Sequence, residues 1–355
     1  MNINIEISNL NKHFLSFELA ADENNPNKKC RSKLVTDDFY SKNEYIISAN
    51  LKKIPYYSNH FLVLEDSEFV NISQLSQQFV EKCNLTIDAK YMIYKYDMPQ
   101  MIAFNDFLFN ITTPKLFIFN VVESFSRILN SLVVLNKHKL CFFNLSPDTI
   151  GFNLDCGRKP IIHNFQTSLL VSQMNVNYIT NIIKKTDDYT HKPLEVHILF
   201  YLIRNEISTI SYSFIQTVCE VFIKNASFLC FFSEKFIDSY KDLCVKSLTK
   251  YINMPAQDVI LAILETIEKW DIYSFSVLYI HIFSSINRVF SLEPCFLTKI
   301  VDLLVKNIHP DPLERQSLEQ FVKYCDDLFD NETGWLFVNK LPAGKMPLLI
   351  DLLGK

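Results

Sequence analysis

One stretch indicates the fold of this chain: Phe142-Phe143-Asn144-Leu145-Ser146-Pro147-Asp148-Thr149-Ile150. It follows a segment in which apolar residues recur every three or four positions, which predicts a long helix with one buried face. A second stretch, Pro160-Ile161-Ile162-His163-Asn164-Phe165-Gln166, is typical of a buried strand that runs into polar residues. Each stretch therefore has an asparagine close behind an apolar run, Asn144 in the first and Asn164 in the second.

The first 98 residues consist of short segments separated by turn-like breaks. Apolar segments and alternation of apolar with polar residues predict strands at 2–8, 14–20, 30–36, 61–64 and 91–96. Asp37-Asp38 is typical of a helix N-terminus, and Pro55 ends the helix expected over 39–53. A second helix is expected near 73–83. These elements predict a small, mainly antiparallel β lobe over residues 1–98.

Helical periodicity dominates the rest of the chain. Helices are expected at 196–205, 211–230, 233–250, 257–269 and 270–289, the last apolar nearly all round and therefore central. We expect a helical lobe over 99–325 and an apolar tail over 326–355 that docks back on the body or on a partner. The fold class is α+β.

Composition excludes several classes of function. The net charge is −4 and the pI is near 6.1, so no basic field is available for nucleic acid. The start of the chain lacks a signal-peptide pattern, and no uncharged apolar stretch is long enough to span a bilayer. Nine cysteines form no C-x-x-C pair, which favours reduced residues. We expect a cytoplasmic protein without membrane insertion.

Five segments, in the order of the family, resemble the protein kinase fold. Residues 142–150 are similar to the catalytic loop H-R-D-L-x-x-x-N, and 160–166 resemble the strand that leads into D-F-G. Residues 192–195 resemble A-P-E, 270–276 resemble the D-x-W-S-x-G that opens the central helix, and 311–315 resemble the late D-P-x-x-R. The resemblance implies a two-lobed, protein-kinase-like fold.

The residues that perform phosphotransfer in kinases are replaced at the matching positions. Asn144 stands at the catalytic base, Ser146 at the phosphate-neutralising lysine, and Thr149 at the metal-binding asparagine. Asn164 replaces the metal-binding aspartate and Gln166 the glycine after it. A neutral amide cannot accept the substrate proton, and Mg²⁺ sites depend on carboxylates and phosphates. We therefore expect no catalytic residues, no metal site and no cofactor.

Glycine is absent from the region that would cover the phosphates. The first glycine of the chain is Gly151, so residues 1–150 cannot build a glycine-rich loop. Such a loop needs free positive φ angles and close backbone approach. The absence of a glycine-rich loop is independent of the replacements at Asn144 and Asn164.

The residues that hold the kinase fold together are retained. The resemblance implies an ion pair between Glu195 and Arg315 and a structural role for Asp271. Glu195 and Asp271 are further apart in sequence than in most kinases, which implies a helical insertion over about 205–265. Such an insertion would be a docking surface or additional core.

In the small lobe the resemblance gives one candidate nucleotide-binding pair. Lys33 or Lys29 would be the strand lysine and Glu44 its helix partner, with 91–96 as the strand before the hinge. The alternative, that Lys33 and Glu44 are ordinary surface charges, stays open.

The sequence thus predicts a catalytically inactive kinase-like protein, similar to those of large nucleocytoplasmic DNA viruses. It would act as a scaffold, regulator or virion component, in the host cytoplasm or the virion, and would bind viral structural proteins or a host or viral kinase. One alternative is an atypical active Ser/Thr kinase that recruits Asp148, Asp155 or His163. Another is a purely structural helical protein, which would lack a five-stranded sheet.

Overall fold

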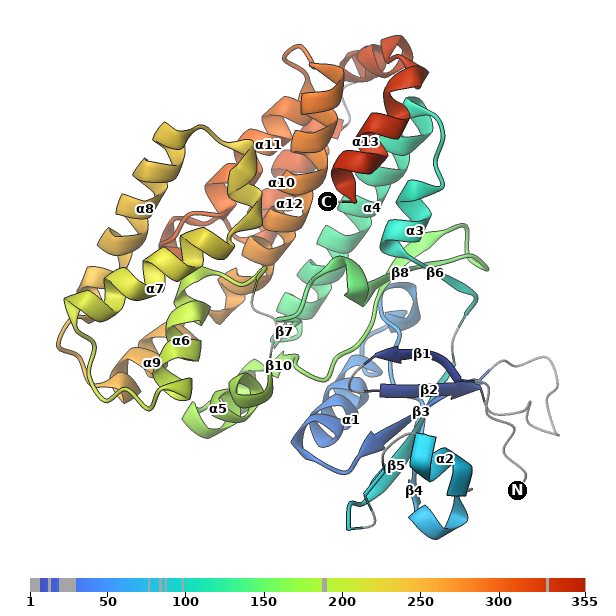
Figure 1. Cartoon of the computed structure of the whole chain (residues 1–355). Helices are drawn as coiled ribbons and strands as arrows, with labels where there is room; N and C mark the ends of the chain where they lie inside the picture. Colours follow the sequence, from blue (N-terminus) through green and yellow to red (C-terminus); the bar gives the residue numbers. More distant parts are fainter. Residues whose placement is uncertain are drawn as a thin grey trace. The chain divides into compact units, whose positions relative to one another are not determined.

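The computed structural model describes residues 7–11, 14–18, 30–75, 77–82, 85–86, 88–97, 99–186, 190–329 and 332–354. They form two compact units that combine helices with antiparallel strands, which confirms the expected α+β class (Figure 1). Unit 1 comprises Met1–Ile102 and Ile150–Ser168, and unit 2 comprises Ala103–Thr149 and Leu169–Lys355. The sequence analysis assigns 150–168 to the larger lobe, whereas the structure groups them with the first unit.

A five-stranded antiparallel sheet is the centre of unit 1. Its order is β1 (Ile7–Asn11), β2 (Phe14–Glu18), β3 (Cys30–Thr36), β5 (Tyr91–Asp97) and β4 (Asp66–Val70). Successive side chains on β3 point to opposite faces. Leu34 therefore packs with Ile93 on one face, and Val35 packs with Tyr94 on the other.

A second, three-stranded sheet explains why 150–168 belong to unit 1. It has the order β6 (Met101–Ala103), β8 (Ile150–Asn153) and β9 (Lys159–Ile162). The backbone N–H of Leu62 donates to the carbonyl of Ile162, and the N–H of Ile162 donates to the carbonyl of His60, both at 2.9 Å. These long-range backbone bonds cannot be seen in the local sequence pattern.

One expected strand is wrong. Residues 61–64 form only an isolated bridge from Phe61 to Ile162, and the strand follows at Asp66–Val70. Phe61, Val63 and Leu64 are buried, so the apolar run reflects core packing and not a sheet ladder. Of the expected strands 2–8 and 14–20, residues 2–6 and 19–20 lie outside the described part of the chain. The expected second helix is α2 (Gln77–Lys82).

Helix α1 (Phe39–Leu51) begins where the sequence predicts. The Asp38 carboxylate accepts hydrogen bonds from the N–H groups of Tyr40 and Ser41 at 2.8 and 3.1 Å. The Ser41 hydroxyl bonds back to Asp38, which completes a capping box. The cap satisfies backbone donors that the first helical turn leaves unpaired.

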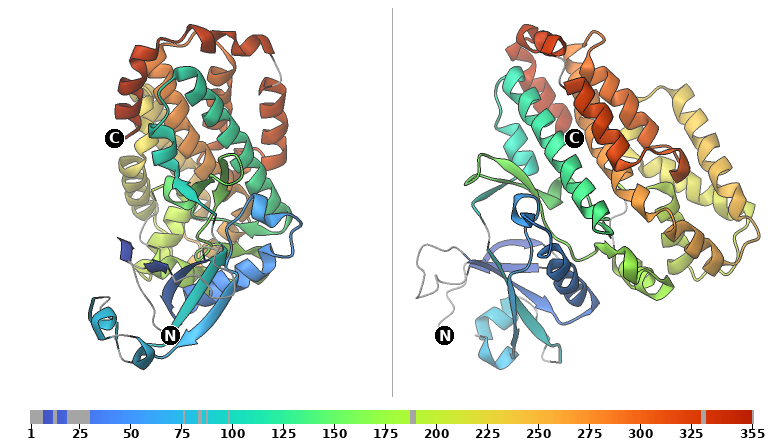
Figure 2. Two further views of the ribbon diagram at one scale, coloured as in Figure 1. Left: turned by 90° about the vertical axis from the view of Figure 1, so that its right-hand side faces the viewer. Right: turned by 180° about the vertical axis from the view of Figure 1, so that it is seen from behind.

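Unit 2 is built from helices around α10. They are α3 (Phe104–Phe109), α4 (Pro114–Lys137), α5 (Val176–Lys185), α6 (Leu194–Arg204), α7 (Tyr212–Asn225), α8 (Glu234–Leu248), α9 (Ala256–Leu264), α10 (Trp270–Phe290), α11 (Phe296–Asn307), α12 (Leu318–Phe329) and α13 (Met346–Leu353). Short strands β7 (Leu140–Cys141) and β10 (Leu169–Leu170) pair beside them. Figures 1 and 2 show α4 and α11 alongside α10. The segment expected as an insertion, about 205–265, contains α7, α8 and α9.

The core of unit 2 is aromatic. Phe125 on α4 lies with its ring centroid 4.8 Å from those of Phe275 and Tyr279 on α10, and 6.0 Å from that of Phe321 on α12. Edge-on and tilted ring contacts of this kind add to the burial of apolar area. The periodic apolar face predicted for the segment before residue 142 is the face of α4 that enters this core.

The apolar tail docks on unit 2. Trp335 stacks on Phe119 of α4 with ring centroids 4.7 Å apart, and its ring lies 4.6 Å from that of Phe296 on α11. Met346 and Leu349 of α13 are buried, and α13 packs against α10. Of the two roles expected for the tail, docking on the body is the one that the structure contains.

Among the described residues, α4 is the one helix whose length and composition would allow it to cross a membrane. In the structure 61% of its most apolar stretch is buried, as in the core helix of a folded unit.

Candidate functional site

Unit 2 contains a buried, bidentate ion pair. Two guanidinium nitrogens of Arg315 lie 2.7 and 2.9 Å from the two carboxylate oxygens of Glu195, at the start of α6. The remaining donors of Arg315 reach the carbonyls of His309 at 2.7 Å and Pro310 at 3.3 Å. Planar, two-point geometry of this kind makes the strongest Arg–carboxylate contacts. The pair ties α6 to the segment before α12.

Asp271, at the start of α10, holds the loop that begins with residue 142. Its two carboxylate oxygens accept hydrogen bonds from the N–H groups of Phe142 and Phe143 at 2.7 and 2.9 Å. Burial raises the pKa of Asp271, and these two hydrogen bonds oppose the rise because they favour the carboxylate. Phe143 has a φ of 67°, a strained backbone for a bulky residue that persists only when its surroundings fix it.

A buried lysine that the sequence analysis gives no role completes this network. The Lys192 ammonium donates to the Phe143 carbonyl at 2.6 Å and reaches the Asn144 side-chain oxygen at 3.4 Å. It also lies 4.1 Å from the centroid of the Phe143 ring, a cation–π contact. A lysine just before Pro193 carries no local sign of burial, so only the tertiary structure reveals it.

The loop 144–149 is closed by a side-chain hydroxyl at its end. The Thr149 hydroxyl lies 3.0 Å from the carbonyls of Asn144 and Ser146 and accepts from the Ser146 N–H at 3.1 Å. Thr149 is buried, and its hydroxyl is engaged within the loop. Asn144 and Ser146 are half-buried and neutral, so these two side chains offer hydrogen bonds but no acid or base.

The candidate pair of unit 1 is also brought together, but loosely. The Lys33 ammonium on β3 lies 3.8 Å from one carboxylate oxygen of Glu44 on α1. The other oxygen accepts from the hydroxyl of Tyr96 at 2.8 Å. Burial lowers the pKa of Lys33, and Glu44 opposes that shift. Burial raises the pKa of Tyr96 well above its ordinary value, with the Glu44 charge adding to it. The alternative register through Lys29 lies outside the described residues.

The polar end of β9 lies in the same unit. Burial, together with the smaller effect of the Lys33 charge, lowers the pKa of His163 to about 4, so the ring is neutral at pH 7. Asn164 has a φ of 69°, a left-handed conformation that asparagine tolerates, and its side-chain oxygen is buried with no hydrogen-bond partner among the described residues. The Gln166 carbonyl accepts from the Asn43 amide of α1 at 2.8 Å.

The predicted residues therefore lie in two clusters. Asn144, Ser146 and Thr149 share unit 2 with Asp271 and the Glu195–Arg315 pair. Lys33, Glu44, Asn164 and Gln166 lie in unit 1.

The three residues proposed as substitute catalytic groups occupy dissimilar places. Asp148 is exposed on the short 3-10 helix Pro147–Thr149 of unit 2. Asp155 is exposed in the β8–β9 turn of unit 1, where it accepts from the Gln100 N–H at 2.9 Å. His163 has a pKa of about 4, far from the operating range of a base at neutral pH.

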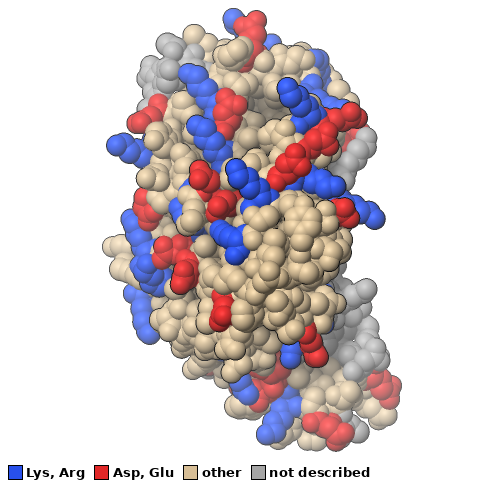
Figure 3. All heavy atoms as spheres, turned by 90° about the vertical axis from the view of Figure 1, so that its left-hand side faces the viewer, with Lys and Arg blue, Asp and Glu red and all other residues tan. Residues whose placement is uncertain are grey.

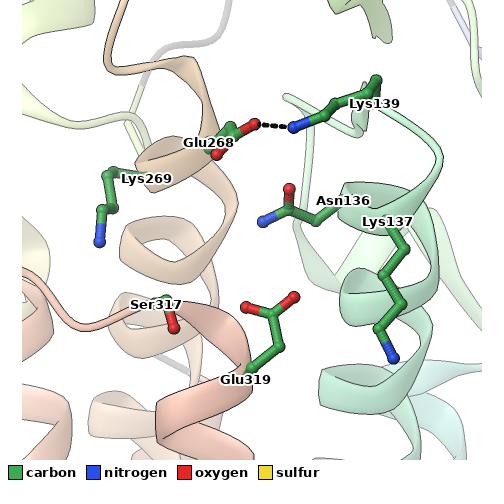
Figure 4. A pocket seen from close by; sticks show the side chains of 7 residues that line it. All are labelled: Asn136, Lys137, Lys139, Glu268, Lys269, Ser317 and Glu319. Carbon is green, nitrogen blue, oxygen red and sulfur yellow. Dashed lines mark hydrogen bonds and ion pairs between the residues drawn. The ribbon is translucent and has the colours of Figure 1, made fainter.

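A surface cavity of about 210 Å³ lies elsewhere in unit 2, between the ends of α4, α10 and α12 (Figure 4). It is lined by Asn136, Lys137, Lys139, Glu268, Lys269, Ser317 and Glu319. Lys139 and Glu268 neutralise each other at 2.6 Å, and Lys269 donates to the Arg315 carbonyl at 2.9 Å. Figure 3 likewise shows Lys and Arg interspersed with Asp and Glu over part of the face that it draws.

Among the described residues, no three His, Cys, Asp or Glu side chains come together as a metal site would require. Compared with known proteins, the chain matches no protein-family model, and no similar curated protein was found.

Proposed function

We propose that this chain is a kinase-like protein that has lost phosphotransfer and works by binding other proteins. Its two units would correspond to the small and large lobes of a protein kinase. The comparisons with known proteins contribute nothing to this proposal, which rests on the residues and their contacts alone.

The geometry of unit 2 supports the proposal through contacts between distant residues. Glu195 and Arg315 are 120 positions apart and form the bidentate pair that the resemblance implies. Asp271 anchors the loop 142–149 from the start of the helix that the resemblance makes central. If these short segments resembled kinase motifs only by chance, there would be no reason to expect these contacts between them.

The geometry of unit 1 supports it in the same way. An active kinase needs an ion pair between a lysine on the third strand and a glutamate on the following helix. Here Lys33 lies on β3 and Glu44 on α1, and their charged atoms are 3.8 Å apart. The five-stranded sheet of unit 1 argues against the alternative of a purely helical structural protein.

One observation carries the proposed loss of activity: amides stand in both loops where the family needs carboxylates. Asp271, Lys192 and Asn43 nevertheless hold the backbone of these loops. Asn144 has no proton-accepting chemistry at neutral pH, and Asn164 offers Mg²⁺ a neutral oxygen. The alternative of an atypical active kinase would need Asp148, Asp155 or His163 to replace them. The solvent exposure of both aspartates and the low pKa of His163 disfavour that alternative.

The test is a thermal-shift titration with ATP in the presence and absence of Mg²⁺, together with transfer of radiolabelled γ-phosphate to a generic protein substrate. We expect no Mg²⁺-dependent shift and no transfer. Stabilisation by several degrees that requires Mg²⁺ and disappears in Lys33→Met would favour the active kinase. Transfer above the level of an Asp148→Asn/Asp155→Asn/His163→Gln triple variant would contradict the proposal outright.

We further propose a viral source, with the protein in the host cytoplasm or the virion. The motif pattern resembles divergent kinase-like proteins of large DNA viruses, and the many Phe and Tyr residues beside only five Gly fit AT-rich coding. Partners would be viral structural proteins or a kinase. Purification from the native source, with identification of the proteins that accompany the chain, tests this assignment.

A further inference from the structure

Two buried thiols of unit 2 lie on neighbouring helices. Cys219 on α7 and Cys244 on α8 are free cysteines, and both residues are 0% exposed. Figure 1 shows α7 and α8 beside each other, and the two helices pack together. They run in opposite directions, because the short segment 226–233 connects the end of α7 to the start of α8. The proposed function gives these two thiols no role.

A contact between aromatic rings fixes the register of the two helices. The rings of Phe222 on α7 and Tyr240 on α8 are stacked, with their centroids 6.4 Å apart. Cys219 lies one helical turn before Phe222, and Cys244 lies one turn after Tyr240. In antiparallel helices a step back along one helix and a step forward along the other lead to the same level. The register therefore places Cys219 opposite Cys244.

Helix packing at this level suits the geometry of a disulfide. The Lys241 ammonium lies 3.8 Å from a carboxylate oxygen of Glu220, which agrees with the register. The axes of packed helices are about 8–10 Å apart and Cα atoms lie about 2.3 Å from each axis, so directly facing Cα atoms are about 4–6 Å apart. The Cα atoms of disulfide-bonded cysteines are usually about 4.4–6.8 Å apart. The two helices would therefore need little movement to be joined.

Burial protects both thiols from reaction in the reduced protein. It raises the pKa of Cys219 to about 12, and it raises the pKa of Cys244 well above its ordinary value. The charge of a Cys219 thiolate adds to the rise in the pKa of Cys244, as expected for neighbours. The thiolate is the form of cysteine that reacts with oxidants. Oxidation of this pair is therefore slow at neutral pH and faster at higher pH.

We propose that Cys219 and Cys244 form an intramolecular disulfide when the protein meets a peroxide. One thiolate attacks an oxygen of hydrogen peroxide, the O–O bond breaks, hydroxide leaves and a sulfenic acid forms. The other thiolate attacks the sulfenic sulfur, the S–O bond breaks and a second hydroxide leaves as the S–S bond forms. The two hydroxides take up the two thiol protons, so two thiols and one peroxide give one disulfide and two waters. The cysteines lose two electrons and the peroxide gains them.

The disulfide would tie α7 to α8. It would close a loop of about 25 residues, which restricts the unfolded chain more than the folded one. Both helices belong to the segment over about 205–265 that the sequence analysis expects as an insertion. Oxidation would therefore fix the arrangement of two helices in that segment. The inference does not depend on the proposed loss of phosphotransfer.

The experiment treats the full chain carrying Cys156→Ser and Cys230→Ser with hydrogen peroxide, because these two exposed thiols would otherwise join separate molecules. Free thiols are then alkylated in denaturant, and the unreduced protein is digested and mapped by mass spectrometry. We expect a crosslink between the peptides that contain Cys219 and Cys244, removed by dithiothreitol. It should form at least about tenfold faster at pH 9 than at pH 7, because the thiolate fraction rises with pH.

Matched variants identify the two thiols. Cys219→Ala or Cys244→Ala should remove the crosslink and leave the other thiol free for alkylation. Cys325→Ala, on α12, removes a thiol that is also buried, at 2% exposed, and it should leave the crosslink unchanged. Circular dichroism before oxidation checks that each variant is folded. If a variant does not fold, the map of the parent chain still decides whether the crosslink forms.

Several results would overturn the inference. One is recovery of residues 219 and 244 as alkylated thiols from a wild-type sample in which Cys156 has been oxidised. Others are a crosslink from either residue to a different cysteine, or sulfinic acid at both positions without a disulfide. A crosslink that appears only after unfolding in urea would show that the folded helices hold the two sulfurs too far apart. Phosphotransfer in the earlier assay would refute the inactive-kinase proposal alone.

Discussion

Two buried ion pairs among the described residues differ in how closely their charged atoms approach each other. In unit 2, Arg315 makes two contacts with Glu195 at 2.7 and 2.9 Å, and its other donors reach backbone carbonyls. In unit 1, Lys33 approaches Glu44 no closer than 3.8 Å. A buried charge is tolerated only when close partners replace its lost hydration. The tight pair is therefore the stronger structural tie, and the loose pair contributes less to stability.

The largest expected effect comes from breaking the tight pair. Arg315→Met leaves the Glu195 carboxylate buried without its partner, and removing one member of a buried pair costs about 3–5 kcal/mol. Urea denaturation followed by circular dichroism measures the loss. Arg127→Met, which breaks an exposed pair with Glu123 on α4, is the control and should cost at most about 0.5 kcal/mol. A loss below 1 kcal/mol for Arg315→Met would remove the distinction between the two pairs.

The stability of unit 1 should depend on pH through the buried ring of His163. The pKa of His163 is about 4 when folded and near 6.5 when unfolded, so the unfolded chain binds more protons between these values. Stability contributed by the neutral ring is present above pH 6.5 and is lost as the pH falls toward 4, by about 3 kcal/mol in total. Denaturation midpoints at stepped pH values measure this slope. His163→Gln should flatten it, whereas the exposed His138→Gln should not.

We expect an intermediate loss of stability when the Asp271 carboxylate is replaced. Asp271→Asn keeps one acceptor and turns an NH₂ group toward the second backbone N–H, so one of the Phe142 and Phe143 donors loses its partner. We expect a loss of about 2 kcal/mol in urea denaturation. The exposed Asp302→Asn on α11 should change stability by at most about 0.5 kcal/mol. Equal losses in both variants would show that the loop does not depend on this anchor.

The smallest effect is expected where the contact is loosest. Lys33→Met removes a half-buried ammonium that gains little from a partner at 3.8 Å, and Glu44 keeps its bond from Tyr96. We expect a change of at most about 1 kcal/mol in either direction. Lys95→Met, at an exposed pair with Glu68, is the matched control in the same unit. A cost like that of Arg315→Met would show the two pairs to be equivalent.

Local patterns predicted the elements whose burial follows a regular period. Strand β3 lies at 30–36 as expected, and α10 covers 270–290 where an all-apolar helix was predicted. The pattern failed at 61–64, because a buried coil segment and a buried strand share the same apolar composition. It also gave no sign that 150–168 pack with unit 1, since that placement depends on backbone bonds to residues 60–62 and 100.

The candidate site residues also divide into those that the sequence predicted and those that it missed. Glu195 and Arg315 were paired from a resemblance, and the structure brings them together. Lys192, Tyr96 and the loop-closing role of Thr149 were missed, because a side chain's partners are set by residues far away in the sequence.

The sequence by itself determined which chemistry is available: no glycine before position 151, and amides at 144 and 164. It did so because a residue's functional groups do not depend on its surroundings. Only the tertiary structure decided which charges are buried and how closely they are paired. Those properties arise from desolvation and from contacts between side chains on different elements of the fold.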